Sequence, residues 1–216
     1  MDLTTWLGYV VELLPGLWKA IQLTVISLAL GYPLALLFAV LMDSKIAPIR
    51  WIILVLVEVG RGLPLLVLLY LFYQGLPQLS IVLSALASAV WAFTWSAAAY
   101  ATEIIRSSLR SVGGGQREAA NAIGLDDRDQ FRFVILPQAA RIAIPPLLGL
   151  AIIMFQLTSL AYVIAYSEVM QSAYFLGTKT FNYFPVFLAA AAVYASVTIP
   201  ASALVTGIER RLSRHV

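Results

Sequence analysis

The sequence contains no cysteine, a single histidine and few charged residues. Asp, Glu, Lys and Arg make up 12% of the 216 residues, whereas soluble domains carry about 25%. A chain this poor in charge cannot cover an ordinary water-facing surface. The absence of cysteine excludes disulfides, thiolate metal sites and thiol catalysis. His215, alone near the C-terminal end, argues against haem or a histidine-based metal centre, so we expect no metal site and no catalytic residues.

Apolar residues are what the chain has in excess, at 61% of the sequence. About 20 consecutive apolar residues cross a hydrocarbon core of about 30 Å. We therefore predict an all-α integral membrane protein whose residues 1–216 form a single transmembrane domain. The five predicted spans cover residues of about 20–42, 51–73, 79–101, 142–164 and 184–206. Glu58 and Arg61 are the only charged residues within them.

Lys and Arg are distributed very unevenly between the two sides of the predicted bundle. With the N-terminus outside, the inner side receives eleven of them: Lys45, Arg50, Arg106, Arg110, Arg117, Arg128, Arg132, Arg141, Arg210, Arg211 and Arg214. The outer side receives Lys19 and Lys179. Because short cytoplasmic loops collect Lys and Arg, we predict an external N-terminus and a cytoplasmic C-terminus. The net charge of +3 thus reflects membrane orientation, and we expect no nucleic-acid partner.

The first 18 residues also carry a helical apolar pattern. Trp6, Leu7, Val10, Leu13, Leu14, Leu17 and Trp18 recur at helical spacing. The pattern predicts an N-terminal interfacial helix on the outer leaflet, with its Trp residues at headgroup level. The alternative is an N-terminal extension of the first span, against which Pro15 and Gly16 argue.

Most connections are predicted to be short turns or loops, including an aromatic-rich outer loop at residues 167–183. The exception is the cytoplasmic stretch 102–141, which has too many charges to enter lipid. Its first part, residues 102–112, reads as a helix that continues the third span.

The centre of this stretch contains helix-start and helix-stop signals. Residues 116–123 read as a short helix, and Gly124 is suited to the left-handed conformation that ends it. Asp126 is predicted to cap the next helix, and Pro137 stands where a further helix into the fourth span can begin. The apolar residues of this segment need either the underside of the membrane domain or another protein to cover them. They are Ala119, Ala120, Ile123, Leu125, Phe131 and Phe133.

These residues carry a recognisable motif. Glu118-Ala119-Ala120, Gly124, Val134, Leu136 and Pro137 resemble the EAA loop of ABC importer membrane subunits, EAA-x3-G-x9-I-x-L-P, with Val134 in place of Ile. A second segment, Glu58-Val-Gly-Arg61-Gly-Leu-Pro-Leu-Leu, resembles the E-x-x-R-G-T-P-L-L motif of polar amino-acid permeases of the histidine/glutamine type. The resemblance runs from about residue 16 to residue 212.

The resemblance implies a set of ATPase-coupling residues in cytoplasmic coupling helices between spans three and four. They are Glu118, Ala119, Ala120, Ile123, Gly124, Leu125 and Phe131. The chain has no G-x-x-x-x-G-K-[ST] phosphate loop, so ATP and Mg would be handled by partner ATPase subunits, and this chain would bind no cofactor. The resemblance further implies two such ATP-binding subunits, a second permease subunit, identical or homologous, and an extracytoplasmic solute-binding protein. Its location would be the bacterial cytoplasmic (inner) membrane.

Six residues of the second and fourth spans are candidates for the substrate pathway. They are Glu58, Arg61, Gln156, Leu157, Thr158 and Ser159. A charge in the bilayer core costs about 3 kcal/mol on insertion scales, so Glu58 and Arg61 should face protein or a water-filled path. Two alternatives stay open: Glu58 and Arg61 form a purely structural ion pair, and the hydroxyls bond carbonyls of their own helix.

The family that the chain resembles usually has Lys followed by Asn or Asp at the positions of Gln156 and Leu157. A heterologous partner subunit carrying the amino-acid site is therefore a further alternative.

Together these features predict a non-enzymatic permease subunit. It would move a polar amino acid or a related small solute inward, driven by a partner ATPase. The alternatives are an ABC importer of another small polar solute and an ATP-independent carrier or channel. A membrane enzyme would need a catalytic cluster, and Asp126, Asp127 and Asp129, which come nearest, look like helix-start residues.

Overall fold

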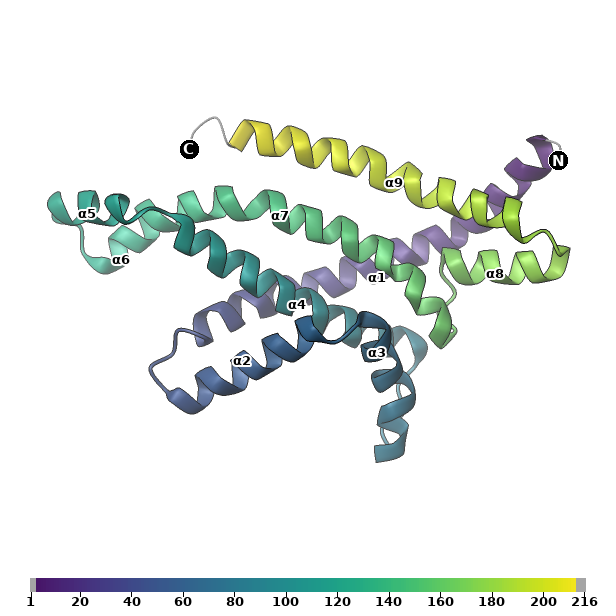
Figure 1. Cartoon of the computed structure of the whole chain (residues 1–216), viewed down its shortest axis with the longest axis horizontal. Coiled ribbons are helices and arrows are strands. Elements are labelled where there is room, and N and C mark those ends of the chain that lie inside the picture. The colour runs from purple at the N-terminus through teal and green to yellow at the C-terminus, as the bar shows by residue number, and fades with distance from the viewer. Residues whose placement is uncertain (1–2, 213–216) are drawn as a thin grey trace.

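The computed structural model describes residues 3–212, which form an elongated helical bundle without β-strands (Figure 1). The long helices are α1 (Leu3–Leu41), α2 (Ala47–Gly62), α4 (Ala85–Ser111), α7 (Leu136–Leu157) and α9 (Tyr183–Leu212). The shorter ones are α3 (Leu65–Tyr70), α5 (Gly114–Ala122), α6 (Asp127–Asp129) and α8 (Val169–Thr180). Two π-helical segments, η1 (Leu71–Gly75) and η3 (Gln130–Ile135), and two 3₁₀ segments, η2 (Leu76–Leu79) and η4 (Thr158–Ile164), complete the set. Arg214 and His215 lie outside the described residues.

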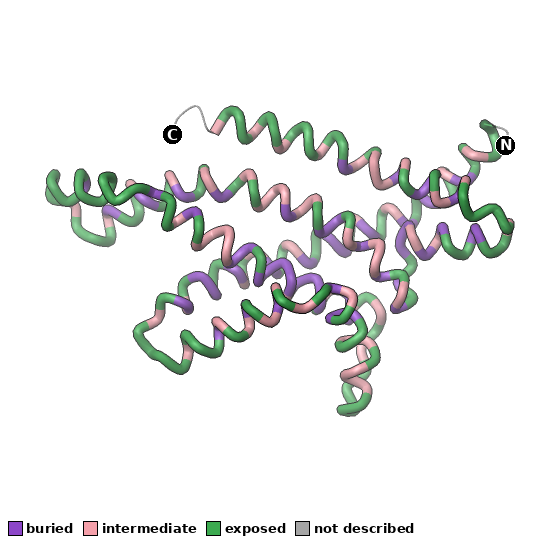
Figure 2. The backbone as a smooth tube through the Cα atoms, viewed as in Figure 1, coloured by how far each residue is buried: buried purple, intermediate pink, exposed green. Residues whose placement is uncertain are grey.

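The central helix of the bundle is α4, which packs against α1, α2, α3 and α7. Its sequence is rich in Ala, Ser and Thr, and most of its buried residues are of these types and lie between Ser88 and Thr102 (Figure 2). Small residues allow close helix approach in membranes, and Gly31 of α1 lies against Ala97 in this way. Polar groups of α4 bond to backbone oxygens of its neighbours, as Trp95 Nε1 does to Leu56 O at 2.9 Å.

Three of the described helical stretches are long and apolar enough to cross a membrane: Leu3–Leu41, Asp127–Ile164 and Tyr183–Leu212. A fourth qualifies if α2 and the segment Leu65–Leu79, bent by 107°, count as one span. The second predicted span is therefore not a straight helix. Pro64 causes the break, because it disfavours helical geometry at Leu63, which adopts ψ 134°. The polar side chains of α4 lower its hydropathy, so the prediction of five spans stays a prediction.

The N-terminal segment differs from the expected separate interfacial helix. α1 runs without a break for 39 residues, so the alternative of an extension of the first span is the correct one. Gly16 does not end the helix: a Cβ there would lie 2.7 Å from Val169 N, so glycine permits close packing on α8. Burial of Tyr9 and Leu13 against α8 and α9 compensates for the hydrogen bond that Pro15 removes.

Two further elements bear on the sequence analysis. A helix begins where Pro137 was expected to start one: α7 starts at Leu136 and has Pro137 in its first turn, although it follows η3 without a break. The π-helical segment η3 ends at Ile135, immediately before α7. Residues 167–183, predicted as a loop, contain α8.

Candidate functional site

The segment from α5 to η3 has well-formed helix ends. Leu125 N donates to Ala120 O at 3.1 Å and Gly124 N donates to Asn121 O at 3.0 Å, the pattern of a Schellman C-cap. Gly124 adopts φ +81°, as predicted. Asp126 Oδ1 accepts a hydrogen bond from Asp129 N at 2.7 Å, so the predicted N-cap is confirmed as well. Local sequence signals thus determine the turn between the two helices.

A buried glutamine that the sequence analysis did not single out holds α5 on η3. Gln130 Nε2 donates to Arg117 O at 2.9 Å and to Asn121 Oδ1 at 3.1 Å. Below it, Val112, Ile135 and Ala139 form a small apolar core. The α5–η3 segment is therefore anchored to the bundle, at the end of the molecule opposite α8 (Figure 1).

The predicted coupling residues form a partly uncovered surface on this anchored segment. Ala120 is buried and Leu125 is half-buried, whereas Glu118, Ala119 and Gly124 are exposed. Ile123 and Phe131 are 77% and 45% exposed. An exposed apolar face of this kind on an ordered helix pair is typical of a docking surface.

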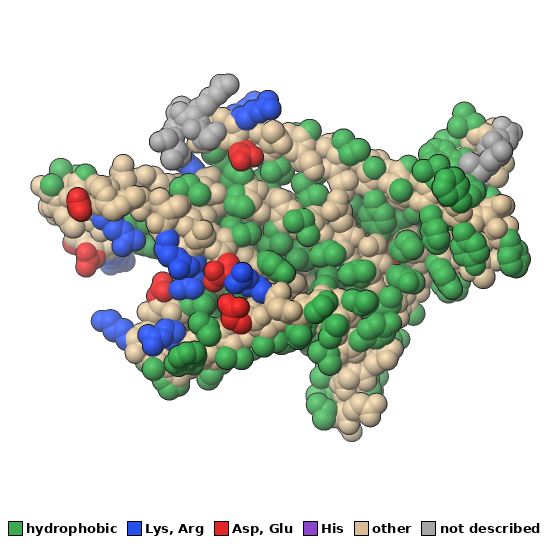
Figure 3. Space-filling model, in the orientation of Figure 1, with side chains coloured by type: hydrophobic (Ala, Val, Ile, Leu, Met, Phe, Trp, Pro, Cys, Tyr) green, Lys and Arg blue, Asp and Glu red, His purple; other side chains and the backbone are tan. Residues whose placement is uncertain are grey.

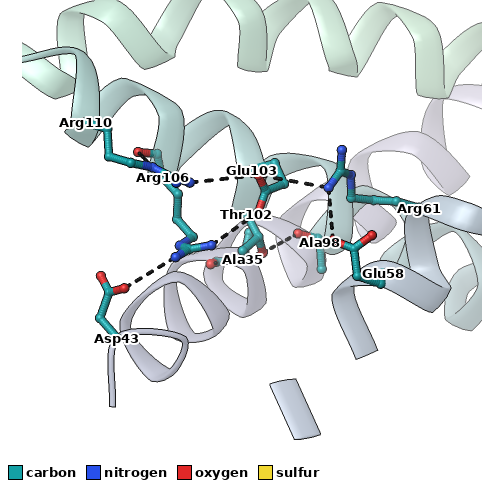
Figure 4. Close-up of polar contacts among 9 residues, drawn as sticks. All are labelled: Ala35, Asp43, Glu58, Arg61, Ala98, Thr102, Glu103, Arg106 and Arg110. Carbon is teal, nitrogen blue, oxygen red and sulfur yellow. Dashed lines mark hydrogen bonds and ion pairs between the residues drawn. The ribbon is translucent and has the colours of Figure 1, made fainter. Parts of the chain in front are cut away.

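A cluster of charged side chains lies where α2 approaches α4 (Figure 4). We call it the Glu103 cluster; it consists of Asp43, Glu58, Arg61, Glu103, Arg106 and Arg110. Within residues 3–212, Glu103 lies near three guanidinium groups: Arg106 at 3.4 Å, and Arg61 and Arg110 each at 4.0 Å. The sequence analysis predicted the Glu58–Arg61 pair, which forms at 3.5 Å, but not that Arg61 also faces Glu103.

The two members of the predicted pair differ in environment. Glu58 has a side chain that is 60% exposed, and that of Arg61 is 35% exposed. The Arg61 Nε atom is buried and has no hydrogen-bond partner within the described part of the chain. A cavity of about 370 Å³ is lined by Arg61, Tyr100, Glu103, Ile104, Ser107 and Pro146. Arg61 therefore retains a buried donor without a partner in this part of the chain, next to a cavity of mixed polar and apolar lining that Glu103 shares.

The second group of candidate pathway residues lies at the junction of α7 and η4. Thr158 Oγ1 donates to Phe155 O at 2.7 Å and Ser159 Oγ donates to Gln156 O at 2.9 Å. Both hydroxyls therefore bond their own helix. Leu157 packs against the main core and the Gln156 side chain is exposed. Within residues 3–212 this group shares no polar partner with Arg61, so the structure does not bring the two groups together.

Glu168 is a functional candidate that the sequence analysis missed. It is fully buried before α8, where it accepts hydrogen bonds from Met170 N and Gln171 N, each at 2.8 Å, and from the Tyr194 hydroxyl at 2.5 Å. Burial raises the pKa of Glu168 to about 7, against the lowering effect of these bonds. Helix N-caps are usually Ser, Thr, Asp or Asn. A glutamate in a predicted loop therefore gave no reason to predict a helix start at this position.

No group of three or more His, Cys, Asp or Glu side chains within residues 3–212 is arranged to hold a metal ion. The groups that the described residues offer for binding are charged side chains and exposed apolar surfaces.

Comparison with known proteins identifies the class of protein to which this fold belongs. Residues 31–214 match the family described as "Binding-protein-dependent transport system inner membrane component", and the chain belongs to that family. It is therefore an inner-membrane permease subunit of an ABC transporter.

The relatives are similar over nearly their whole length. The L-cystine transport system permease protein TcyB of Bacillus subtilis is 39% identical over 202 residues, which cover 93% of this chain and 86% of TcyB. The probable glutamine ABC transporter permease protein GlnP of Bacillus subtilis is 35% identical, covering 94% of this chain and 97% of GlnP. The crystal structure of an amino acid ABC transporter with histidines superposes with a TM-score of 0.93 and 32% identity, covering 98% of this chain and 99% of that one.

Proposed function

We propose that this chain is the permease subunit of an ABC importer that moves a polar amino acid or a closely related solute into the cell. The observation that carries the proposal is the match, over 98% of this chain, to a chain in the crystal structure of an amino acid ABC transporter. The names of TcyB and GlnP point to the same class of substrate.

The membrane topology that we propose has five spans, with the N-terminus outside and the C-terminus in the cytoplasm. Three spans are the long apolar stretches described above, and α2 with the bent segment after it forms the fourth. The fifth is α4, whose small polar residues are tolerated because other helices cover them. This orientation puts the α5–η3 segment in the cytoplasm.

The α5–η3 segment couples the permease to a cytoplasmic ATPase. Its exposed Ile123 and Phe131 supply apolar contacts and Glu118 supplies a charge. Because the Gln130 hydrogen bonds and the core at Val112 tie the segment to α4 and α7, movement of the docked ATPase is transmitted to these helices. ATP and Mg are bound by two partner ATPase subunits, and the transporter is completed by a second permease subunit and an extracytoplasmic solute-binding protein.

The substrate pathway passes Arg61. Its unpartnered Nε and the adjacent cavity suit a carboxylate, the group that all amino acids carry. Glu58, exposed beside it, is placed to meet an ammonium group. We keep Gln156, Leu157, Thr158 and Ser159 as residues of the same pathway, where the exposed Gln156 amide is the available polar contact.

The complex reconstituted in liposomes tests the proposal. ATPase activity is measured against a panel of amino acids, each presented with the cognate binding protein. We expect strong stimulation by a few polar amino acids, and a flat response to all of them would contradict the substrate assignment. Glu118→Lys should abolish stimulation, whereas Asp127→Lys, an equal change in charge on the neighbouring exposed α6, should retain most of it.

Single and double changes at the charge pair separate transport from structure. Arg61→Gln should raise the substrate concentration needed for half-maximal uptake by at least tenfold, because a charge-assisted contact contributes about 1.5–3 kcal/mol. Arg50→Gln, at an exposed position on α2, is the matched control. If Glu58→Gln/Arg61→Gln restores normal uptake, the pair is structural and does not contact substrate.

A further inference from the structure

A large apolar groove lies on the face of α4 opposite Glu103. It has a volume of about 670 Å³. The second half of α1 and the first half of α7 form its walls, and Ile105 and Leu109 of α4 form its floor. Apart from Tyr32 and Asp43, the side chains that line it are apolar. Its volume falls within the range of about 300–1,000 Å³ that is typical of ligand pockets.

One end of the groove is closed by a hydrogen bond between its walls. The Tyr32 hydroxyl donates to Leu147 O at 2.6 Å, joining α1 to α7. From this contact the groove extends along α1 to its end at Leu41, about 14 Å at 1.5 Å per residue. Half of a hydrocarbon core of about 30 Å is about 15 Å. The groove therefore matches the depth of one leaflet of the bilayer.

A basic pocket adjoins the other end of the groove. This pocket, of about 170 Å³, is lined by Asp43, Arg106, Leu109, Arg110, Arg117 and Phe131. Asp43, Leu109 and Phe131 also line the apolar groove, so the two spaces are adjacent. The space-filling view shows Lys and Arg side chains, with Asp and Glu among them, gathered toward the end of the molecule where α2, α4 and α5 lie (Figure 3).

The arginines of the pocket are not fully neutralised. The Glu103 carboxylate is shared by three arginines, and Asp43 pairs with Arg106 at 3.4 Å. The side chain of Arg110 is 64% exposed and reaches Glu103 only at 4.0 Å. Arg117 is exposed and forms no ion pair with any residue of the 3–212 range. Arg110 and Arg117 are thus available to an anion.

We infer that the basic pocket and the apolar groove together form a binding site for an anionic phospholipid. The headgroup phosphate binds Arg110 and Arg117, and one acyl chain occupies the groove between α1 and α7. Basic pockets between transmembrane helices on the cytoplasmic side suit anionic headgroups, and a groove one leaflet deep suits an acyl chain. The inference rests on the proposed function only for the orientation of the chain.

Native mass spectrometry of the purified complex tests the site directly. After delipidation, the complex is titrated with phosphatidylglycerol and, separately, with zwitterionic phosphatidylcholine of the same acyl chains. We expect at least one retained phosphatidylglycerol per permease chain and clearly weaker binding of phosphatidylcholine. Equal retention of both lipids would overturn the anionic site.

Charge-removing variants probe the pocket. Arg110→Gln/Arg117→Gln should weaken phosphatidylglycerol binding roughly 30-fold, since each basic residue near the membrane surface contributes about 1 kcal/mol. Arg128→Gln/Arg132→Gln, outside the pocket, removes the same charge and should change binding by less than threefold. If the two double variants weaken phosphatidylglycerol binding equally, the binding depends on general surface charge, and the inference of a specific site is overturned.

Filling the groove provides a second test that leaves the arginines intact. Ala140→Trp places a large side chain in the groove, whereas Ala191→Trp places one on the exposed face of α9. Only Ala140→Trp should remove the tightly bound lipid. If it instead separates the two permease subunits without lipid loss, the groove is a protein interface and the inference fails. Lipid retention is read without substrate or ATP, so a failed amino-acid assignment would not affect the result.

Discussion

Two glutamates in different parts of the bundle show two ways in which the protein stabilises a carboxylate. Glu103 lies partly exposed near three arginines of α2 and α4. Glu168 is completely buried, and its carboxylate accepts hydrogen bonds from two backbone N–H groups and a tyrosine hydroxyl, with no salt bridge to any residue from 3 to 212. The first is stabilised by opposite charge that solvent screens, and the second by hydrogen bonds in a desolvated site. Removing the two carboxylates should therefore have unequal consequences.

Glu168→Leu should have the largest effect on stability. The change leaves Met170 N, Gln171 N and the Tyr194 hydroxyl without their acceptor, and each buried donor left unpaired costs about 1–3 kcal/mol. We expect a loss of roughly 4 kcal/mol, measured as a fall in the apparent melting temperature of the purified complex. Glu12→Leu, on an exposed position of α1, is the control, and an equal fall there would contradict the role of Glu168.

The pH dependence of stability should separate the two sites further. The pKa of Glu168 is raised to about 7 in the folded protein, so the unfolded chain releases this proton at lower pH. The protonated group stabilises the folded protein fully below about pH 4.5. This contribution to the free energy of unfolding, about 3 kcal/mol, is lost as pH rises toward 7. Glu168→Gln should flatten the melting temperature across this interval. A parallel fall in wild type and variant would assign the effect to another group.

Close packing beside Glu168 can be tested at Gly16. A Cβ at this position would lie 2.7–2.9 Å from backbone atoms of Glu168 and Val169. Gly16→Ala should destabilise the protein by about 2 kcal/mol, as overpacking does, although alanine favours helix. Gly8→Ala on the same helix meets nothing within 4 Å and should be neutral or stabilising. The difference in melting temperature between the two variants measures the contact.

Glu103→Gln should have a smaller effect, about 1–2 kcal/mol. Arg61 and Arg106 lose their shared carboxylate in a partly buried site, and each keeps one more exposed partner, Glu58 or Asp43. The loss should shrink in high salt, which screens repulsion between the arginines. Melting curves at low and high salt check this expectation, and a salt-independent loss would indicate a packing defect instead.

Glu58→Gln should have the smallest effect, below about 0.5 kcal/mol, because its side chain is 60% exposed and its ion pair with Arg61 is 3.5 Å long. Stability is measured in the same melting assay. A loss as large as that of Glu103→Gln would mean that Glu58, rather than Glu103, is the main partner of Arg61.

Local signals explain which parts of the fold could be predicted. Gly124 and Asp126 end and start helices through hydrogen bonds within five residues of themselves, and both predictions are confirmed. The continuity of α1 could not be predicted, because Pro15 and Gly16 are helix-breaking by local propensity. Contacts with α8 and α9, more than 150 residues away in the chain, outweigh that propensity.

The candidate site likewise has features that local sequence predicts and features that depend on long-range contacts. The spacing of Glu58 and Arg61 predicts their pairing, since residues three apart share a helix face. The approach of Arg61 to Glu103 depends on the crossing of α2 and α4, which no local pattern encodes. Glu168 was missed because the residues around it carry no usual N-cap signal, and its importance comes from Tyr194 on another helix.

The sequence by itself determined the membrane class, the family and the turn between α5 and α6, because hydropathy and helix caps act over short stretches of chain. Only the tertiary structure decided which charges share partners, which glutamate is buried and where a groove meets a basic pocket. These properties arise from the packing of helices that are distant in the chain, and packing is set by the shapes of all the contacting surfaces together.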